Sequence, residues 1–418
     1  MQVNESVEIR GHIMDSGILT RALDDIRDYG GDYVIDRFEV GRNHDDESYA
    51  RVVVSSDTEE DLARLLMRLH AHGLNPADPG EAIVRTAAKD GVFPDDFYST
   101  TNLETQVRLG GHWRNVEHPE MDCGLRVVDE GANPRVHTVP VSDVRAGDRL
   151  VCGASGVRVM PPPIPLKRDA GAFEFMNSQV SSEKPQALLV RQIAEQMREV
   201  RRSGRKILWV GGPAVVHTGA APAMVALVQA GYVDVLFAGN ALATHDIEAA
   251  LFGTSLRVDL SKGRGVEHGH EHHIRAINTV RKYGSIAGAV EAGVLTSGVM
   301  HAMVKAGKPF VLVGSVRDDG PLPDVYTDVI EGQRAMRGQL KGVGFAIMVA
   351  TMLHSIATGN LLPASVPLVS VDINPATVTK LADRGSAQAI GIVTDIGLFL
   401  EQLALLLVPD YRMPGQPT

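Results

Sequence analysis

Apolar positions in the first part of the chain follow two periods, the two-residue period of strands and the longer period of helices. Val7 and Ile9 open an alternating strand, and apolar residues then recur at helical spacing over 18–26. Two more strands, a second helix and a short strand near 81–84 complete the pattern. The order β-α-β-β-α-β predicts a ferredoxin-like α+β domain over residues 1–98. Such a domain either binds a small ligand or serves only structure or oligomerisation.

The composition changes after this domain. Residues 99–160 contain short strand-like runs separated by Gly, Asn, Pro and Asp, which predicts a small β-domain. Proline-rich sequence follows, and residues 161–184 are expected to form a stiff, extended linker. Within the β-domain, Glu120 and Asp122 lie beside Cys123. Two carboxylates next to a thiol can bind an amine or a metal ion, and the alternative is a solvated turn.

Beyond the linker, residues 185–410 contain short continuous apolar runs separated by helical stretches. The runs lie at 206–210, 233–237, 310–313, 368–371 and 389–392. Continuous apolar strands with helices between them predict an α/β domain whose parallel sheet is covered on both faces. A glycine-rich apolar stretch at 342–350 is interpreted as a buried helix against a cofactor, or simply as core. Ligands of such sheets bind at the carboxyl ends of the strands.

Four of these strand ends carry polar or glycine-rich sequence. Gly211-Gly212-Pro213 lets the backbone approach a phosphate, although no GxGxxG motif is present. The turn at 238–246 opens a helix whose N–H groups can face a phosphate or a ring amide. The loop at 314–324 holds three acids and an arginine, which is too polar for a plain connection unless the loop is simply solvated. Asp372 closes an apolar strand, where a carboxylate either accepts hydrogen bonds from a ribose or caps a helix.

The composition narrows the possible functions. Hydrophobic residues make up 44% and charged residues 22%, the balance of a globular protein. The net charge of −10 argues against nucleic-acid binding and, less strongly, against docking on anionic membranes. Cys123 and Cys152, the only cysteines, fit a reducing compartment better than a disulfide scaffold. No apolar signal region and no run of about 18 apolar residues occurs, so we expect a soluble, cytoplasmic protein.

A group of four histidines invites a metal interpretation. The group consists of His268, His270, His272 and His273. Zinc ligands usually come from separated elements, and no cysteine pair accompanies these histidines. A solvated loop and a contact with substrate are the alternatives, and we expect no metal.

Several of these strings together resemble the archaeal-type ornithine cyclodeaminases. They are 239–255, Gly-Ser-Val-Arg-Asp-Asp-Gly-Pro-Leu-Pro-Asp at 314–324, Glu-Met-Asp-Cys-Gly at 120–124 and Val-Asp-Ile-Asn-Pro at 371–375. The resemblance covers nearly the whole chain. It includes the so-called lysine-ketoglutarate reductase/saccharopine dehydrogenase region at the N-terminus, and it extends to the C-terminal module of cyanobacterial bifunctional arginine dihydrolase/ornithine cyclodeaminases. It implies a parallel-sheet NAD-binding domain of the deoxyhypusine-synthase type, in which no GxGxxG is expected.

The resemblance also implies an activity, conversion of L-ornithine to L-proline and ammonia with bound NAD. This is a lyase reaction of arginine/ornithine catabolism and proline biosynthesis. Carried over by position, the resemblance places NAD against residues at the strand ends. These residues are Asn240, Ala241, Asp319, Thr351, Met352, Leu353, His354, Asp372, Asp395 and Ile396. It carries over no catalytic residue.

The chemistry itself narrows the catalytic candidates. Hydride must leave Cα of ornithine, the δ-amine must attack the resulting imine, and hydride must return after ammonia has left. The protein must therefore hold two ammonium groups and a carboxylate, and move protons near neutral pH. Acids suit the ammonium groups, Arg317 suits the carboxylate, and His245 or His354 suits proton transfer. The catalytic candidates are Asp318, Asp324, Glu120, Asp122 and His245.

Two other functions stay open at this point. An NAD-dependent amino-acid dehydrogenase of saccharopine type would show net production or consumption of NADH, and a non-enzymatic NAD- or amino-acid-sensing protein would bind without turnover. Enzymes of this size are commonly symmetric homo-oligomers, which we expect here. Because pockets form preferentially at domain interfaces, we also expect Glu120–Cys123 to close the substrate side of the site, with Cys123 as a small packing residue.

Overall fold

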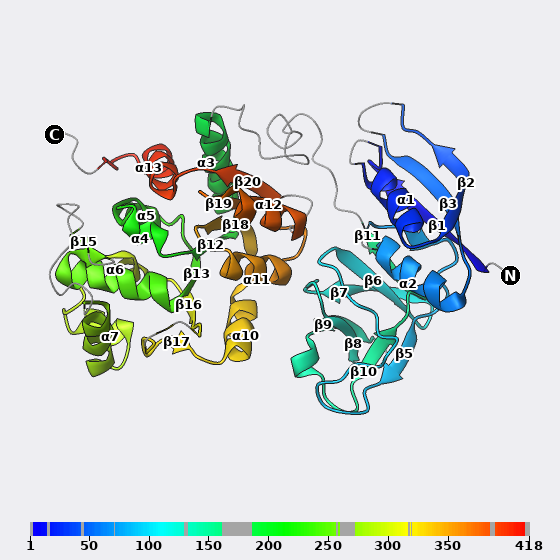
Figure 1. Ribbon diagram of the computed structural model, residues 1–418, viewed down its shortest axis with the longest axis horizontal. Helices are drawn as coiled ribbons and strands as arrows, with labels where there is room; N and C mark the ends of the chain where they lie inside the picture. Colours follow the sequence, from blue (N-terminus) through cyan, green and yellow to red (C-terminus); the bar gives the residue numbers. More distant parts are fainter. Residues whose placement is uncertain are drawn as a thin grey trace. The chain divides into compact units, whose positions relative to one another are not determined.

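The computed structural model divides the chain into two compact units (Figure 1). The first is Met1–Asn177 with Asn360–Ser365, and the second is Ser178–Gly359 with Val366–Thr418. The residues that the structure describes are 3–14, 17–42, 46–70, 72–128, 133–160, 186–255, 258–259, 272–316, 318, 320–384 and 389–413. The expected linker at 161–184 lies outside these ranges.

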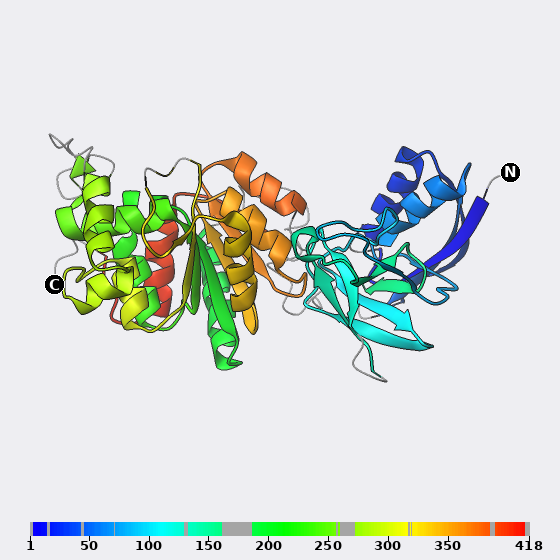
Figure 2. The same ribbon diagram turned by 90° about the horizontal axis from the view of Figure 1, so that it is seen from below.

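The first unit begins with a four-stranded antiparallel sheet that two helices cover on one face (Figure 2). Its elements are β1 (Val3–Gly11), α1 (Ile18–Asp28), β2 (Asp32–Glu39), β3 (Ser48–Ser56), α2 (Glu59–His70) and β4 (Asn75–Pro76), with strand order β2-β3-β1-β4. Val7 and Ile9 of β1 point to the same face as Val52 of β3, and Ile26 and Leu65 of the helices complete this core. The alternation of strand residues therefore sets which face is buried.

A seven-stranded sheet forms the rest of the first unit. Its strands are β5 (Ile83–Thr86), β6 (Glu104–Leu109), β7 (His112–Glu117), β8 (Gly124–Val128), β9 (Arg135–Val139), β10 (Arg149–Cys152) and β11 (Val157–Met160), in the order β11-β6-β7-β9-β8-β10-β5. One prediction is wrong here, because the strand expected near 81–84 does not close the first sheet. As β5, it pairs with β10, while Asn75–Pro76 pairs with β1. A short apolar run does not specify its partner strand, which is why sequence alone misplaced it.

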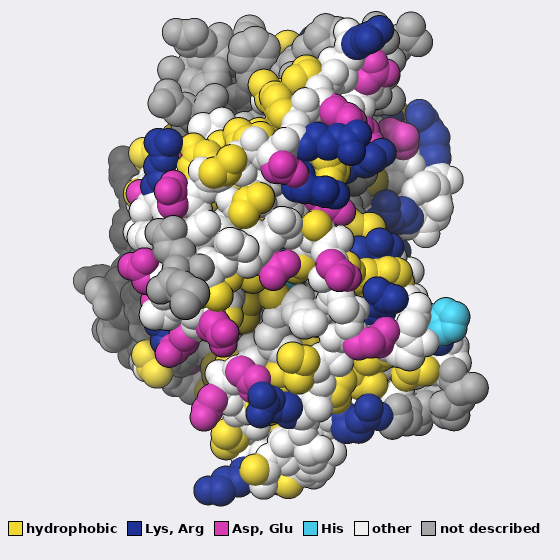
Figure 3. Space-filling view, turned by 90° about the vertical axis from the view of Figure 1, so that its right-hand side faces the viewer, with side chains coloured by type: hydrophobic (Ala, Val, Ile, Leu, Met, Phe, Trp, Pro, Cys, Tyr) yellow, Lys and Arg dark blue, Asp and Glu magenta, His cyan; other side chains and the backbone are white. Residues whose placement is uncertain are grey.

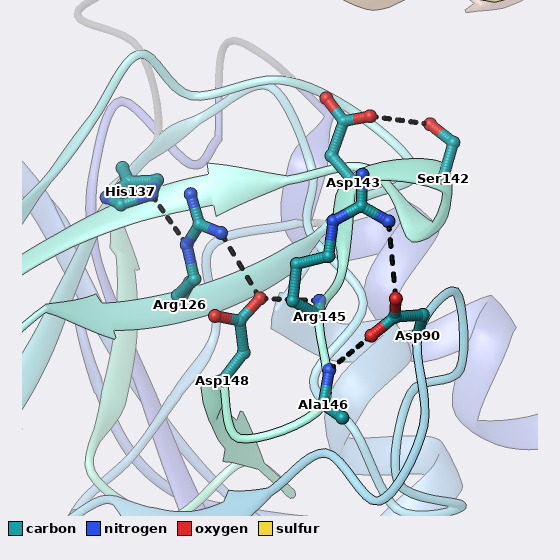
Figure 4. A network of polar contacts seen from close by, with 8 residues as sticks. All are labelled: Asp90, Arg126, His137, Ser142, Asp143, Arg145, Ala146 and Asp148. Atoms are coloured by element: carbon teal, nitrogen blue, oxygen red, sulfur yellow. Dashed lines mark hydrogen bonds and ion pairs between the residues drawn. The ribbon is translucent and has the colours of Figure 1, made fainter.

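A polar network fastens the turn that leads into β10 (Figure 4). Arg126 of β8 donates to His137 of β9 at 3.0 Å and to Asp148 at 3.2 Å. The Asp148 carboxylate also accepts the Arg145 N–H at 2.8 Å. Burial, and then the charge of Arg126, lower the pKa of His137, so its ring is neutral and accepts the Arg126 bond. The network satisfies half-buried charges and needs no ligand.

Strand β2 is an edge strand with exposed apolar side chains. Val34 is 66% exposed and Val40, just after the strand, is 56% exposed, while Ile35 and Phe38 are also exposed. Figure 3 shows apolar side chains lying close to Lys and Arg side chains on one face of the protein. Edge strands present unpaired backbone groups, so an apolar edge is available for pairing.

The second unit is a seven-stranded sheet in which every strand pair is parallel (Figure 1). Its strands are β12 (Lys206–Gly211), β13 (Val235–Gly239), β16 (Phe310–Val313), β17 (Val325–Tyr326), β18 (Val343–Val349), β19 (Leu368–Asp372) and β20 (Ala389–Val393). The order is β17-β16-β13-β12-β18-β19-β20. A small hairpin, β14 (Thr254–Ser255) and β15 (Val258–Asp259), stands apart from this sheet.

Helices lie on both faces of the parallel sheet (Figure 2), as the continuous apolar runs predict. They are α3 (Gln186–Arg202), α4 (Ala214–His217), α5 (Ala221–Gln229), α6 (Asn240–Phe252), α7 (His272–Lys282), α8 (Ile286–Glu291), α9 (Val299–Lys305), α10 (Val329–Gln339), α11 (Leu353–Leu361), α12 (Pro375–Arg384) and α13 (Ile396–Leu407). No helix within the described ranges is both long and apolar enough to cross a membrane.

The stretch at 342–350 differs from the interpretation as a buried helix, because residues 343–349 form the central strand β18. All seven of its residues are buried. A strand covered on both faces shows no alternation of apolar and polar residues, so its pattern cannot be told from that of a buried helix segment. Its short length and its branched residues, Val343, Ile347 and Val349, favour the strand.

Candidate active site

The parallel sheet reverses its strand order between β12 and β18. Along the chain, strands are added outward from β12 to β17 on one side and from β18 to β20 on the other (Figure 1). Ligands of doubly wound sheets bind at the carboxyl ends of the strands beside this reversal. The four strand ends that the sequence singled out, at Gly211, Gly239, Val313 and Asp372, belong to this edge of the sheet, as does the end of β20 at Val393.

The turns that follow β12 and β18 meet closely at the point of reversal. A Cβ atom built on Gly212 would lie 1.9 Å from the Ala350 carbonyl oxygen and 3.1 Å from Cβ of Thr351. The Gly212 N–H donates to the Val349 carbonyl at 2.9 Å. Ala350 has a φ of 53°, a left-handed conformation that is uncommon for residues other than glycine. The two turns therefore approach each other closely because residue 212 has no side chain, and a site that brings backbone close to a phosphate needs such a position.

On the β18 side, the residues expected to bind NAD surround the start of α11 and the end of β19. Met352 and Leu353 are exposed, Leu353 by 74%. The Asp372 carboxylate accepts the Asn374 N–H at 2.8 Å, while Asn374 itself accepts the Ala376 N–H in the first turn of α12. Asn374 is thus the cap of the helix, and Asp372 keeps acceptor capacity at the strand end for a ribose.

The side chains of Asp395 and Ile396, which follow β20, take part in the structure of α13. The Asp395 carboxylate accepts the Leu398 N–H at 2.9 Å and caps the helix, and the Ile396 side chain is buried. Only their backbone and the remaining carboxylate acceptor capacity suit a cofactor contact.

On the β12 side, the Asn240 side chain forms hydrogen bonds within the protein. Its amide oxygen accepts the Leu322 N–H at 3.0 Å and the Thr244 hydroxyl at 3.2 Å, and the side chain is buried. These bonds fasten the acidic loop to α6. The backbone of Asn240 and Ala241, at the N-terminus of α6, is what this strand end offers to a cofactor.

The acids of the loop at 314–324 have different surroundings. Asp318 accepts the Ser315 N–H at 2.8 Å and so shapes its own turn. Asp324 accepts the Ile286 N–H at 2.8 Å at the start of α8, and burial raises the pKa of its carboxyl. Asp319 and Arg317 lie outside the described residues, as do His268 and His270. Among the described residues, no group of three or more His, Cys, Asp or Glu side chains is arranged to hold a metal ion.

Three histidines lie beyond the ends of β12, β13 and β18. His354 packs against Gly239, where a built Cβ would lie 3.2 Å from the ring, and burial lowers its pKa. His245 Nδ1 lies 2.8 Å from Glu248 Oε2, and its ring meets that of His217 edge-on at 4.8 Å between centroids. Sequence reasoning missed Glu248 and gave His217 no role. The i, i+3 spacing of a histidine and a glutamate within one helix was the signal for the pair.

Glu120 and Asp122 belong to the first unit. The Glu120 side chain is buried, and its backbone carbonyl accepts the Thr100 hydroxyl. Asp122 has a φ of 61° and accepts a long bond, 3.4 Å, from the Asn360 amide. Cys123 is buried and donates its N–H to Thr100 at 3.0 Å, which suits a packing residue. The catalytic roles of Glu120 and Asp122 stay predictions.

Three family models together match almost the whole chain. They are the C-terminal Rossmann fold of arginine dihydrolase ArgZ-like proteins at 191–403, the first region of the same C-terminal part at 104–190, and the conserved region of the bifunctional LOR/SDH enzyme at 4–103. Among curated proteins, ornithine cyclodeaminase of Methanothermobacter thermautotrophicus is 52% identical over 94% of this chain and 95% of its own length.

Solved structures give the same relationship. Apo ArgZ, an arginine dihydrolase from cyanobacteria, matches with a TM-score of 0.84 and 38% identity, over 97% of this chain and 58% of the ArgZ chain. The complex of AgrE with ornithine and NAD+ matches with a TM-score of 0.52 and 40% identity, over 97% of this chain and 57% of that one. This chain thus spans little more than half of the cyanobacterial proteins. The Rossmann fold and the suspected family are confirmed, and the chain belongs to the archaeal ornithine cyclodeaminase family.

Proposed function

We propose that this protein is an NAD-dependent ornithine cyclodeaminase that converts L-ornithine to L-proline and ammonia. The observation that carries the proposal is the relationship over nearly the full length of an archaeal ornithine cyclodeaminase, combined with a parallel sheet whose two turns meet closely at Gly212, at the point of reversal. AgrE, which matches this chain in sequence and structure, binds ornithine and NAD+ in its crystal structure. Both the cofactor and the substrate class therefore come from proteins of the same family.

The residues at the sheet edge fit NAD. Gly212 and the turn at Ala350 bring backbone close together at the strand ends beside the start of α11, which suits a pyrophosphate, and Asp372 offers a carboxylate to the adenosine ribose. Thr351, Met352, Leu353 and His354 flank the same helix start. Exposed apolar side chains at Leu353 and at Ile373, which is 70% exposed, offer surface to a flat base. When bound, NAD takes a hydride from the substrate and gives it back.

Because Asp372 is proposed to bind the adenosine ribose on the β19 side, the nicotinamide half of NAD is expected to extend across the point of reversal toward β12 and β13. The strand ends on that side carry Asn240, Ala241 and Asp319 as proposed cofactor contacts. Asp318 and Asp324 are the proposed partners of the two ammonium groups of ornithine. Arg317 is the proposed partner of its carboxylate.

Incubation with ornithine and a small amount of NAD, followed by assay for proline and ammonia, tests the function. We expect proline and ammonia in equal amounts and no net change in NADH. A steady production or consumption of NADH with an amino acid and a keto acid would instead identify a saccharopine-type dehydrogenase. Tight NAD binding without turnover of any amino acid would identify a sensing protein.

We also infer a finer classification of the fold. The element order β-α-β-β-α-β and the strand order β2-β3-β1-β4 support a ferredoxin-like domain at the N-terminus. The wide parallel sheet without a GxGxxG turn supports the deoxyhypusine-synthase type of NAD-binding domain. The sequence has only two cysteines, Cys123 and Cys152, and both are buried, which supports a reducing, cytoplasmic location.

We propose further that the protein is a homo-oligomer in which two copies of β2 pair with each other. An antiparallel register that puts Asp36 opposite Arg37 of the second copy also puts Ile35 opposite Phe38. The same register therefore pairs opposite charges and pairs apolar side chains across the interface. Sedimentation should show a dimer or a multiple of a dimer. Phe38→Asp should halve the mass of this assembly, whereas Val92→Asp, at another exposed apolar residue, should leave the mass unchanged. A monomeric parent protein, or an unchanged mass for Phe38→Asp, would exclude this interface.

A further inference from the structure

Helix α6 carries a buried carboxylate–imidazole pair that the proposed cofactor contacts do not use. Glu248 Oε2 lies 2.8 Å from His245 Nδ1, and the side chains are 1% and 16% exposed. Removing a carboxylate from water costs several kcal/mol unless its surroundings compensate. A buried glutamate facing a histidine near a ligand-binding sheet edge is therefore a candidate for chemistry rather than for stability.

The fold holds this pair firmly in place. His245 and Glu248 are three residues apart, so they share one face of α6. Asp246, between them, points elsewhere and accepts the N–H groups of Val299 and Met300 at 2.8 Å each, which caps α9. Together with the Asn240 bonds to the acidic loop, these contacts fix the rotation of α6 about its axis.

His217 completes the arrangement from the neighbouring strand. It ends the short helix α4 that follows β12, and its ring meets the His245 ring edge-on. Burial, and then the charge of His245, lower the pKa of His217 to about 4, so this ring is neutral near pH 7. The Glu248 carboxylate therefore faces His245, and His217 contributes a neutral ring beside this pair. Both histidines follow strands on the side of the reversal away from Asp372, the side assigned above to the nicotinamide and the substrate.

We propose that His245, with Glu248 behind it, accepts a proton from an ammonium group of ornithine and later returns it to the departing ammonia. The proposal rests on the cyclodeaminase function proposed above and assigns its acid–base group. A carboxylate can only accept, so Nδ1 of His245 carries the proton that faces Glu248, and Nε2 keeps its lone pair. Glu248 then stabilises the imidazolium that forms, as the acid of a catalytic triad does for its histidine.

The proton balance of the reaction needs such a group. In the transfer, an N–H bond of the ammonium breaks, a bond to Nε2 of His245 forms, and the electron pair stays on the amine nitrogen, which becomes a nucleophile. Singly charged ornithine, C5H13N2O2+, equals proline, C5H9NO2, plus NH4+ in atoms and in charge. No proton is gained or lost overall, so a proton taken early must be given back to the leaving nitrogen. One positioned group that acts as base and then as acid satisfies this requirement. His217 is a positioning residue in this scheme.

The test compares two reactions of the same protein. The complete reaction starts from ornithine, whereas reduction of the cyclic imine 1-pyrroline-2-carboxylate by NADH starts after ammonia has left and needs no deprotonation of an ammonium group. The variants are Glu248→Gln, which keeps an acceptor for His245 but loses the charge, and Glu248→Asp, which keeps the charge. Glu291→Gln, on the exposed end of α8, and His301→Gln, on α9, are the controls.

We expect Glu248→Gln to lower proline formation from ornithine by about 100-fold while reduction of the cyclic imine stays within about threefold of the parent. Glu248→Asp should recover part of the activity, and both controls should match the parent. Equal loss of both reactions in a Glu248→Gln protein that still binds NAD, or no loss of either, would overturn the proposal. If Glu248→Gln does not fold, the same comparison on His245→Asn decides in the same way. A parent protein that makes no proline from ornithine would instead refute the proposed function.

Discussion

Substitution of alanine for Gly212 should damage the cofactor site directly. The added Cβ would lie 1.9 Å from the Ala350 carbonyl oxygen, whereas real Cβ contacts are essentially never below 3.0 Å. The two turns must therefore separate by about 1.1 Å, the difference between these values. Neither can yield easily, because Gly212 donates to Val349 and Ala350 already has a φ of 53°. Overpacking of this kind costs about 1–3 kcal/mol of unfolding free energy.

The functional loss should exceed the loss of stability. A displacement of about 1 Å at a binding site costs on the order of 100-fold when the geometry matters. We expect Gly212→Ala to weaken NAD binding by that order, measured by calorimetric titration, with a lower thermal midpoint. Gly338→Ala on α10 is the matched control, since a Cβ built there meets no atom within 4 Å apart from its chain neighbours and the backbone of its own helix. The control should be neutral or slightly stabilising. NAD affinity that is equal in the two variants would show that the turns at 212 and 350 do not form the cofactor site.

Three further predictions concern single side chains. Asp372→Ala should weaken NAD binding by about 1.5–3 kcal/mol, the worth of a hydrogen bond to a charged group, and an unchanged affinity in titration would remove its ribose role. Asn240→Ala leaves the buried Leu322 N–H without its acceptor, so urea unfolding should show a loss of about 1–3 kcal/mol. Burial lowers the pKa of His70 from 6.5 to about 4, so only the unfolded chain takes up this proton between those values. The contribution of neutral, buried His70 to the unfolding free energy should thus be fully present above pH 6.5. As the pH falls toward 4, the unfolding free energy should decrease by up to about 3 kcal/mol. In His70→Gln, this part of the pH dependence should disappear, and the same dependence in both proteins would contradict the assignment.

Much of the architecture follows from local patterns in the sequence. The continuous apolar runs at 206–210 and 368–371 became central parallel strands, because a strand covered by helices on both faces needs apolar residues at every position. The run at 343–349 obeys the same rule, yet periodicity could not separate a buried strand from a buried helix there. The strand near 81–84 was assigned to the wrong sheet, because its partner, β10, follows it by more than sixty residues in sequence. Pairing over such separations depends on tertiary packing that local patterns do not encode.

The sequence predicted the location of the candidate site better than the roles of its polar atoms. The sheet rule directed attention to the right strand ends, since carboxyl ends of parallel strands share one edge. It did not reveal which polar atoms the protein itself uses. Asn240 is occupied by Leu322 and Thr244, and Asp395 caps α13. The pair of His245 and Glu248 depends on α6 being buried around most of its surface, a fact that only the packed structure supplies.

The most direct test of the central claim follows the hydrogen at Cα of the substrate. L-Ornithine deuterated at C2 and labelled with 15N at the δ position is incubated with the protein and a small amount of NAD, and the proline is analysed by mass spectrometry and NMR. The cyclodeaminase mechanism predicts that proline retains both the deuterium at C2 and the 15N in its ring, that the ammonia is unlabelled, and that NADH does not accumulate. Proline that has exchanged its C2 deuterium for solvent hydrogen, or labelled ammonia with unlabelled proline, would contradict the account.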